Sequence, residues 1–171
     1  MRTVIAGLIA LALAAPVQAQ EPPTSRVLQK GYAAGFKDCA RALERFIVFI
    51  HEDDDDFGYL STWSTKRPND EMMSALTVQT FTDGHGVTTF SGVKTAPGVC
   101  DITLTQTVTL PELPCDKARA DAFREWKPLT ELGDLPVYED PTDPNTTATL
   151  APLGKTGCVV VKHILALGVS N

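Results

Sequence analysis

The spacing of apolar residues predicts two helices. From about residue 25 to about residue 51, apolar residues recur every three or four positions, which is the pattern of a helix with one buried face. Cys39 lies on that apolar stripe. A second helical pattern runs from Cys115 to Trp126 and is stopped by Pro128, because proline removes a backbone donor. Each predicted helix therefore carries one cysteine on its apolar side.

Seven other segments show the alternation or apolar content of strands, and turn-forming residues separate most of them. These segments cover residues 57–63, 73–81, 87–91, 99–110, 135–138, 146–151 and 158–167. Because the links between successive strands are short, neighbouring strands should pair antiparallel. The expected fold is α+β, with two helices packed on one face of a mainly antiparallel sheet in the order α-ββββ-α-βββ.

Three of the predicted strands carry additional information. In residues 99–110, Cys100 shares its face with apolar residues, while threonines line the other face as on a solvated sheet surface. Residues 158–167 are apolar on both faces except at Lys162 and His163, which predicts a central strand. Pro136 predicts an edge position for residues 135–138.

The N-terminal residues have the pattern of a cleavable secretion signal. Arg2 precedes an uncharged apolar run of about a dozen residues, well short of the ~20 that a membrane-spanning helix needs. Val17 and Ala19 give the small residues that a signal peptidase reads, so we expect cleavage before Gln20. The sequence thus predicts a signal at residues 1–19 and one domain at residues 20–171, periplasmic or secreted, without a membrane span.

The charge is acidic and narrows the choice of partners. The chain carries a net charge of −6, and the loss of Arg2 with the signal makes the mature chain more negative still. Because nucleic acids and anionic lipids are themselves negatively charged, this charge opposes non-specific binding to either. It permits another envelope protein with a basic surface as partner, although negative charge more often serves only to keep a protein soluble.

Four cysteines in an exported chain predict two disulfides. They are Cys39, Cys100, Cys115 and Cys158. The closest pair in sequence is 15 positions apart, so the short spacing typical of a zinc or thioredoxin-type site is missing. We therefore predict no metal among the cysteines and no cofactor.

The predicted strands also limit how the cysteines can pair. An extended segment of ten residues spans roughly 30 Å, whereas disulfide-bonded Cα atoms lie within about 7 Å, which disfavours Cys100–Cys115. Two connectivities remain. The favoured one is Cys39–Cys100 with Cys115–Cys158, because Cys39 and Cys100 both face the core. Cys39–Cys115 with Cys100–Cys158 stays open.

No residue set points to a catalytic site. The acidic run Asp53–Asp56 has carboxylates suited to calcium but lacks the spacing of an EF-hand loop, so a solvated loop is the simpler interpretation. His51, His85 and His163 belong to no recognisable nucleophile motif. The sequence predicts no catalytic or cofactor-binding residue, and calcium at the acidic run stays open.

Two weaker patterns complete the analysis. Phe57, Tyr59 and Trp63 are interpreted as core beneath the first helix, in preference to an exposed binding platform. Each half of the chain opens with a cysteine-bearing helix and closes with a cysteine at the start of an apolar strand. The separations of 61 and 43 residues differ, and the rest of the halves does not align, so we attribute this likeness to chance.

Small size, predicted export, disulfides and acidity favour a non-enzymatic protein that binds another protein, as inhibitors, immunity proteins and accessory factors do. Two alternatives stay open. One is a small hydrolase whose site is assembled from distant residues, and the other is a carrier with a cavity between helices and sheet. An exposed apolar or acidic face favours the first hypothesis, convergent histidines and carboxylates favour the hydrolase, and a deep apolar pocket favours the carrier.

Overall fold

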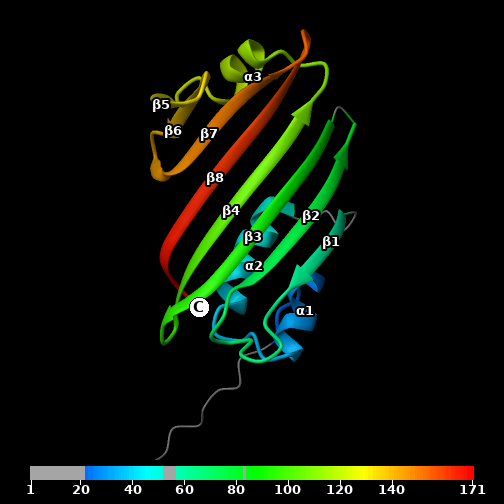
Figure 1. Cartoon of the computed structure of the whole chain (residues 1–171), viewed down its shortest axis with the longest axis vertical. Coiled ribbons are helices and arrows are strands. Elements are labelled where there is room, and N and C mark those ends of the chain that lie inside the picture. Colours follow the sequence, from blue (N-terminus) through cyan, green and yellow to red (C-terminus); the bar gives the residue numbers. More distant parts are fainter. Residues whose placement is uncertain (1–21, 52–56, 83) are drawn as a thin grey trace, which may run out of the picture.

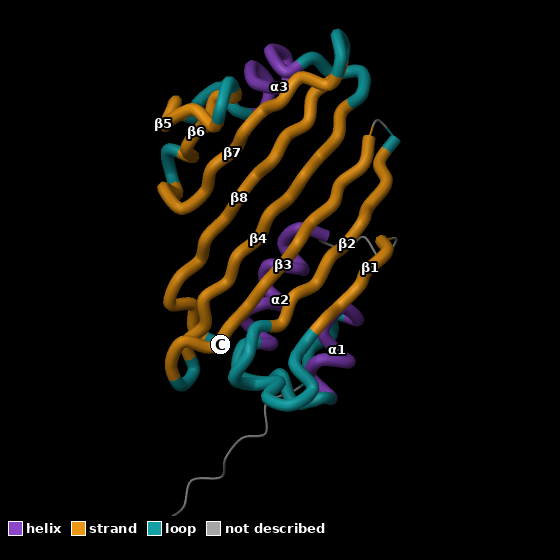
Figure 2. The backbone as a smooth tube through the Cα atoms, in the orientation of Figure 1, coloured by secondary structure: helices purple, strands orange, loops and turns teal. Residues whose placement is uncertain are grey.

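The computed structural model describes residues 22–51, 57–82 and 84–171. Across those residues, three helices accompany one eight-stranded antiparallel sheet (Figures 1 and 2). The helices are α1 (Arg26–Ala33), α2 (Ala40–His51) and α3 (Cys115–Ala122). The strands are β1 (Phe57–Thr62), β2 (Met73–Phe81), β3 (Gly84–Ala96), β4 (Val99–Leu110), β5 (Lys127–Leu132), β6 (Leu135–Asp140), β7 (Asp143–Leu153) and β8 (Gly157–Ser170). The α+β class with an antiparallel sheet is therefore confirmed.

The sheet consists of two four-stranded meanders joined at their last strands. Its strand order is β1-β2-β3-β4-β8-β7-β6-β5, and every neighbouring pair is antiparallel. The first meander follows α1 and α2, and the second follows α3. The described residues thus form two units, one of two helices and four strands and one of one helix and four strands, which meet where β4 pairs with β8.

From the β4–β8 ladder outward, each unit has its last strand innermost and its first strand at the edge of the sheet. Both disulfide cysteines of these strands occupy the second position, Cys100 in β4 and Cys158 in β8. The two units therefore share one plan of strand order and disulfide placement.

All three helices pack on one face of the sheet, which we call the inner face. The larger core lies between this face and α1 and α2, and joins fourteen buried residues around Phe90 and Leu104. The smaller core lies beneath α3 and contains four buried residues, Ala118, Leu150, Cys158 and Val160. The opposite, outer face is turned toward the viewer in Figure 1.

The prediction of one helix over residues 25–51 is wrong, because the chain turns between Ala33 and Ala40. Gly35 adopts a φ of 114°, which side chains disfavour and which ends α1. Phe36 then inserts into the larger core with 1% of its surface exposed. The side chain of Asn69 accepts hydrogen bonds from the backbone N–H groups of Lys37 and Asp38, so the turn keeps its polar groups satisfied.

The second unit contains a strand that the sequence prediction missed. The helix predicted to Trp126 ends at Ala122, and β5 follows and pairs with β6. The predicted order α-ββββ-α-βββ is therefore wrong by one helix and one strand. The edge position predicted for residues 135–138 is also wrong, because β5 lies outside β6. Pro128 lies in β5 at this edge, where a strand tolerates proline.

The side chain of Asn171 caps helix α2 from the far end of the sequence. Its Oδ1 accepts hydrogen bonds from the backbone N–H groups of Arg41 at 3.0 Å and Ala42 at 3.2 Å. These donors lie in the first turn of α2, where they have no partner within the helix. The cap therefore joins α2 to the end of β8.

Replacing Asn171 with alanine should lower the free energy of unfolding by about 1 kcal/mol, as loss of a helix cap does. Asn171→Asp keeps an acceptor oxygen and places negative charge at the positive end of the helix, so it should stay near the wild-type stability. Urea unfolding followed by circular dichroism measures both variants. Equal losses in the two variants would contradict the capping role.

Candidate functional site

The first disulfide joins the turn before α2 to β4, and the second joins the first residue of α3 to β8. Cys39 is bonded to Cys100 with their Cα atoms 5.8 Å apart, and Cys115 is bonded to Cys158 with a Cα separation of 4.8 Å. This is the connectivity that the sequence favoured over the crossed alternative. Both bonds have a structural role, because Cys39, Cys100 and Cys158 are at most 1% exposed.

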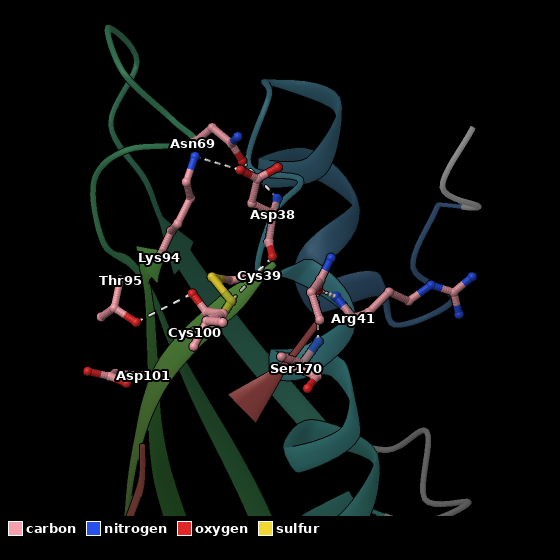
Figure 3. Close-up of a disulfide and its surroundings, with 12 residues drawn as sticks. Asp38, Cys39, Arg41, Asn69, Lys94, Thr95, Cys100, Asp101 and Ser170 are labelled. Carbon is pink, nitrogen blue, oxygen red and sulfur yellow. Dashed lines mark hydrogen bonds and ion pairs between the residues drawn. A yellow bond between two sulfur atoms is a disulfide. The ribbon is translucent and has the colours of Figure 1, made fainter. Parts of the chain in front are cut away.

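An ion pair lies beside the first disulfide (Figure 3). Lys94 Nζ lies 2.8 Å from Asp38 Oδ2, and the side-chain oxygen of Asn69 accepts a hydrogen bond from the backbone N–H of Asp38. Hydrogen bonds from Lys94 and then Asn69 stabilise the charged carboxylate and hold the pKa of Asp38 below its ordinary value. The cluster connects the β3–β4 hairpin to the turn before α2. Its ion pair and hydrogen bonds therefore have a structural role.

Replacing Lys94 with methionine should lower the thermal midpoint at pH 7. Because folding lowers the pKa of Asp38, its stabilisation is present above the ordinary value of 3.8 and disappears as the pH falls through the folded value. The difference between Lys94→Met and wild type should therefore shrink at pH 3. Differential scanning calorimetry at both pH values tests this, with Lys155→Met as the control at an exposed turn. A difference that stays constant between pH 7 and pH 3 would contradict the ion-pair explanation.

Exposed aliphatic side chains gather on the outer face near the β1 edge. Leu60 pairs with Leu76 across β1 and β2, and Val78 pairs with Val87 across β2 and β3. Their exposed fractions are 64% for Leu60, 38% for Leu76, 40% for Val78 and 36% for Val87. We call these four residues the outer patch. Among the described residues, no helix packs against the outer face.

In β4, toward the middle of the sheet, the outer face is lined by threonines. The threonines predicted on one face of β4 do point away from the core, and each is half-buried among its neighbours on the sheet. His163 of β8 lies opposite Thr105, and its Nδ1 is 3.1 Å from the threonine hydroxyl. The outer patch is therefore an apolar area bordered by a threonine-rich surface.

A groove crosses the inner face between α2 and α3, and we call it the inner groove. Its larger cavity has a volume of about 410 Å³ and lies between α2, β8 and the β6–β7 turn. A smaller cavity of about 190 Å³ adjoins it beneath Phe123. Lys162 lines both cavities. The groove exists because α3 has eight residues and leaves some of the second unit uncovered.

The histidines are not brought together. His51 is buried on the inner face, where its Nε2 lies 2.9 Å from the Thr77 hydroxyl and its ring stacks on Phe57. His163 is exposed on the outer face, and His85 is exposed near the start of β3. The described residues contain no group of three or more histidine, cysteine or acidic side chains arranged to hold a metal ion. The acidic run Asp53–Asp56 lies outside the described residues.

The early aromatic residues belong mainly to the core. Phe57 and Trp63 are partly buried and pack against the larger core, as predicted. Tyr59 is 39% exposed, and the guanidinium of Arg26 lies over its ring and that of Phe57, at 5.5 and 4.6 Å from the centroids. The sequence analysis did not identify the outer patch or the inner groove, since each combines residues from several strands.

Comparison with protein-family models found no matching family, and comparisons with curated proteins and with solved structures found no match. The described helices are all too short or too polar to cross a membrane. The candidate sites therefore rest on geometry alone: an apolar patch on the outer face, and a groove with a lysine on the inner face.

Proposed function

We propose that the protein is exported and acts as a non-enzymatic factor that binds another envelope protein through its outer patch, as an inhibitor or immunity-type protein does. The observation that carries this proposal is the patch itself. Leu60, Leu76, Val78 and Val87 adjoin one another on a sheet face that no described helix covers. Contiguous exposed aliphatic residues commonly mark protein interaction sites.

Two further features support this proposal. The two disulfides are compatible with an oxidising compartment such as the periplasm or the extracellular space. The net charge of −6 favours a partner with a basic surface, because opposite charges speed association and disfavour acidic competitors. The expected partner therefore presents an apolar patch with basic residues at its rim.

Site-specific photo-crosslinking tests the proposed interface. A photo-crosslinking amino acid replaces Leu76 in the protein expressed in its native host, and crosslinked products are identified by mass spectrometry. We expect one envelope protein to crosslink from Leu76 and not from Leu132. Leu132 is a suitable control because it is 69% exposed, like Leu60 at 64%, but lies at the opposite edge of the sheet.

The identified partner must then bind the purified protein directly. Calorimetric titration should show that Leu60→Ser with Leu76→Ser weakens binding at least about tenfold, whereas Leu132→Ser leaves it unchanged, because buried aliphatic anchors dominate interface energy. Equal crosslinking from both positions, or full affinity in the double variant, would overturn the assignment of the outer patch.

Export is tested separately by mass spectrometry of the protein from its native host. The mature chain should begin at or near Gln20 and should be found outside the cytoplasm. Soluble cytoplasmic protein that retains Met1 would contradict export without bearing on the outer patch.

A further inference from the structure

Lys162 occupies an unusual position in the inner groove. Its side chain is half-buried, and it lies between the larger and the smaller cavity. Its Nζ is 5.8 Å from the ring centroid of Trp126. Among the residues that the structure describes, no carboxylate lies within ion-pair distance of this ammonium group. Among the described residues, the groove thus contains a cation that has an aromatic neighbour and forms no ion pair.

The two carboxylates in the larger cavity are already engaged by their own turns. Asp140 accepts hydrogen bonds from the backbone N–H and the hydroxyl of Thr142, at 2.8 and 2.7 Å. Asp143 accepts one from the hydroxyl of Thr146 at 2.6 Å and one from the backbone N–H of Asn145 at 3.1 Å. The Thr142 bonds, and to a smaller extent the charge of Lys162, lower the pKa of Asp140. These acids stabilise the β6–β7 turn and do not neutralise Lys162 directly.

The rest of the groove is mostly apolar. Phe46, Phe49 and Ile164 line the larger cavity, and Val108, Val160 and Phe123 line the smaller one. Phe49 is 65% exposed, although it is an aromatic residue on a helix that packs on the sheet. A volume of about 410 Å³ is in the range of small-molecule sites, which combine apolar walls with a few polar groups.

We propose that the inner groove binds an anionic amphiphile, a molecule with a carboxylate headgroup and an apolar chain, such as a fatty acid. The carboxylate accepts hydrogen bonds from Lys162, and the chain lies against Phe46 and Phe49. Arg45 lies at the rim, where its guanidinium donates to the backbone carbonyl of Ser170 and adds positive charge near the entrance. The site lies on the opposite face of the sheet from the outer patch.

Charge selectivity is the first test. Decanoate, decanol and decyltrimethylammonium share a ten-carbon chain and differ in headgroup charge. Each is titrated below its aggregation concentration into the Trp63→Phe protein, in which Trp126 is the remaining tryptophan. We expect saturable changes in Trp126 emission, with decanoate binding at least about tenfold more tightly than decanol, as one charge-assisted contact predicts. Decyltrimethylammonium should bind no better than decanol.

Variants of the groove provide the second test. Lys162→Met should reduce the affinity for decanoate to that for decanol, while Lys162→Arg should retain most of the preference. Lys155→Met, at an exposed turn, should bind like wild type. Phe49→Ser should weaken decanoate and decanol alike, whereas Val48→Ser should not, because Val48 is 47% exposed on the same helix and does not line the groove. Thermal unfolding establishes that each variant is folded.

Several outcomes would overturn the proposal. They are the absence of saturable binding, equal affinity for decanoate and decanol, a preference for the cation, and an unchanged preference in folded Lys162→Met. The double variant at Leu60 and Leu76 should bind decanoate like wild type, since those residues lie on the outer face. Failure of the inner groove and failure of the outer patch as a protein interface can therefore be told apart.

Discussion

Replacement of both Cys115 and Cys158 with alanine is expected to release α3 from the sheet and to lower the free energy of unfolding by about 4 kcal/mol. The bond joins residues separated by 43 positions, and a loop of this length gives roughly that value in the chain-entropy model. Helix α3 has little else to hold it, because Ala118 is its one buried residue and the core beneath it has four members. Removing the bond should therefore affect α3 first.

Hydrogen exchange of the native protein distinguishes local release from general weakening. In the Cys115→Ala, Cys158→Ala variant, backbone amides of residues 115–122 should lose protection while those of β3 and β4 keep theirs. The matched variant Cys39→Ala, Cys100→Ala removes a bond between residues 61 positions apart, which should also lower the free energy of unfolding by about 4 kcal/mol. In this variant the backbone amides of α3 should stay protected. Equal protection of α3 in both variants would show that packing, and not the disulfide, holds this helix.

Replacing Phe90 with alanine should destabilise the protein by about 3–5 kcal/mol, the usual range for a large aromatic residue in a core. Phe90 has no exposed surface and lies between Ala75 and Leu104 on the inner face, within the larger core. Its ring also lies 6.1 Å from that of His51. Its removal leaves a cavity near the centre of the first unit, which the surrounding strands cannot close.

Phe90→Leu should cost much less, about 1 kcal/mol, because most of the buried volume is retained. Phe81→Ala is the comparison at a partly exposed site, since Phe81 is 42% exposed, and it should cost less than Phe90→Ala. Chemical unfolding monitored by tryptophan fluorescence gives all three values. A loss below about 1.5 kcal/mol for Phe90→Ala would mean that the site collapses around the missing ring.

Strands with a regular alternation were predictable from the sequence, and β2 and β4 have the bounds expected of them. The alternation is clear there because buried residues alternate with more exposed ones over the first half of each strand. Strand β5 gave no such signal, since all six of its residues are exposed and Pro128 suggested only the end of a helix. Strand β3 was predicted too short because Gly84, Gly86 and Gly92 interrupt its side-chain pattern.

The need for glycine at one position of β3 becomes apparent only from the packing of the sheet. A Cβ at Gly84 would lie 2.1 Å from the carbonyl oxygen of Thr109, so the backbones of β3 and β4 could not approach as they do. The end of α1 near Gly35 was also not predictable from local sequence. The helical spacing of apolar residues continues through Gly35, and its φ of 114° is visible only in the folded structure. Local pattern alone therefore overestimated the length of the first helix.

The candidate sites were less predictable than the disulfides. Cysteine pairing followed from strand length and from which residues face the core. The inner groove depends on α3 ending at Ala122, four residues before the predicted end. With the longer helix, the inner face of the second unit would be more completely covered. The position of Lys162 in a central strand was predicted, but its place between two cavities needed the three-dimensional structure.

The disulfide pattern has a consequence for the order of oxidation. Each bond joins cysteines that are neighbours in the sequence of four, first with second and third with fourth, and each lies within one unit. In the export that we propose, the N-terminal end leads, so Cys39 and Cys100 emerge before Cys115 and Cys158 do. A thiol oxidase that joins cysteines as they appear therefore makes the native bonds directly, and no reshuffling by an isomerase is required to complete maturation.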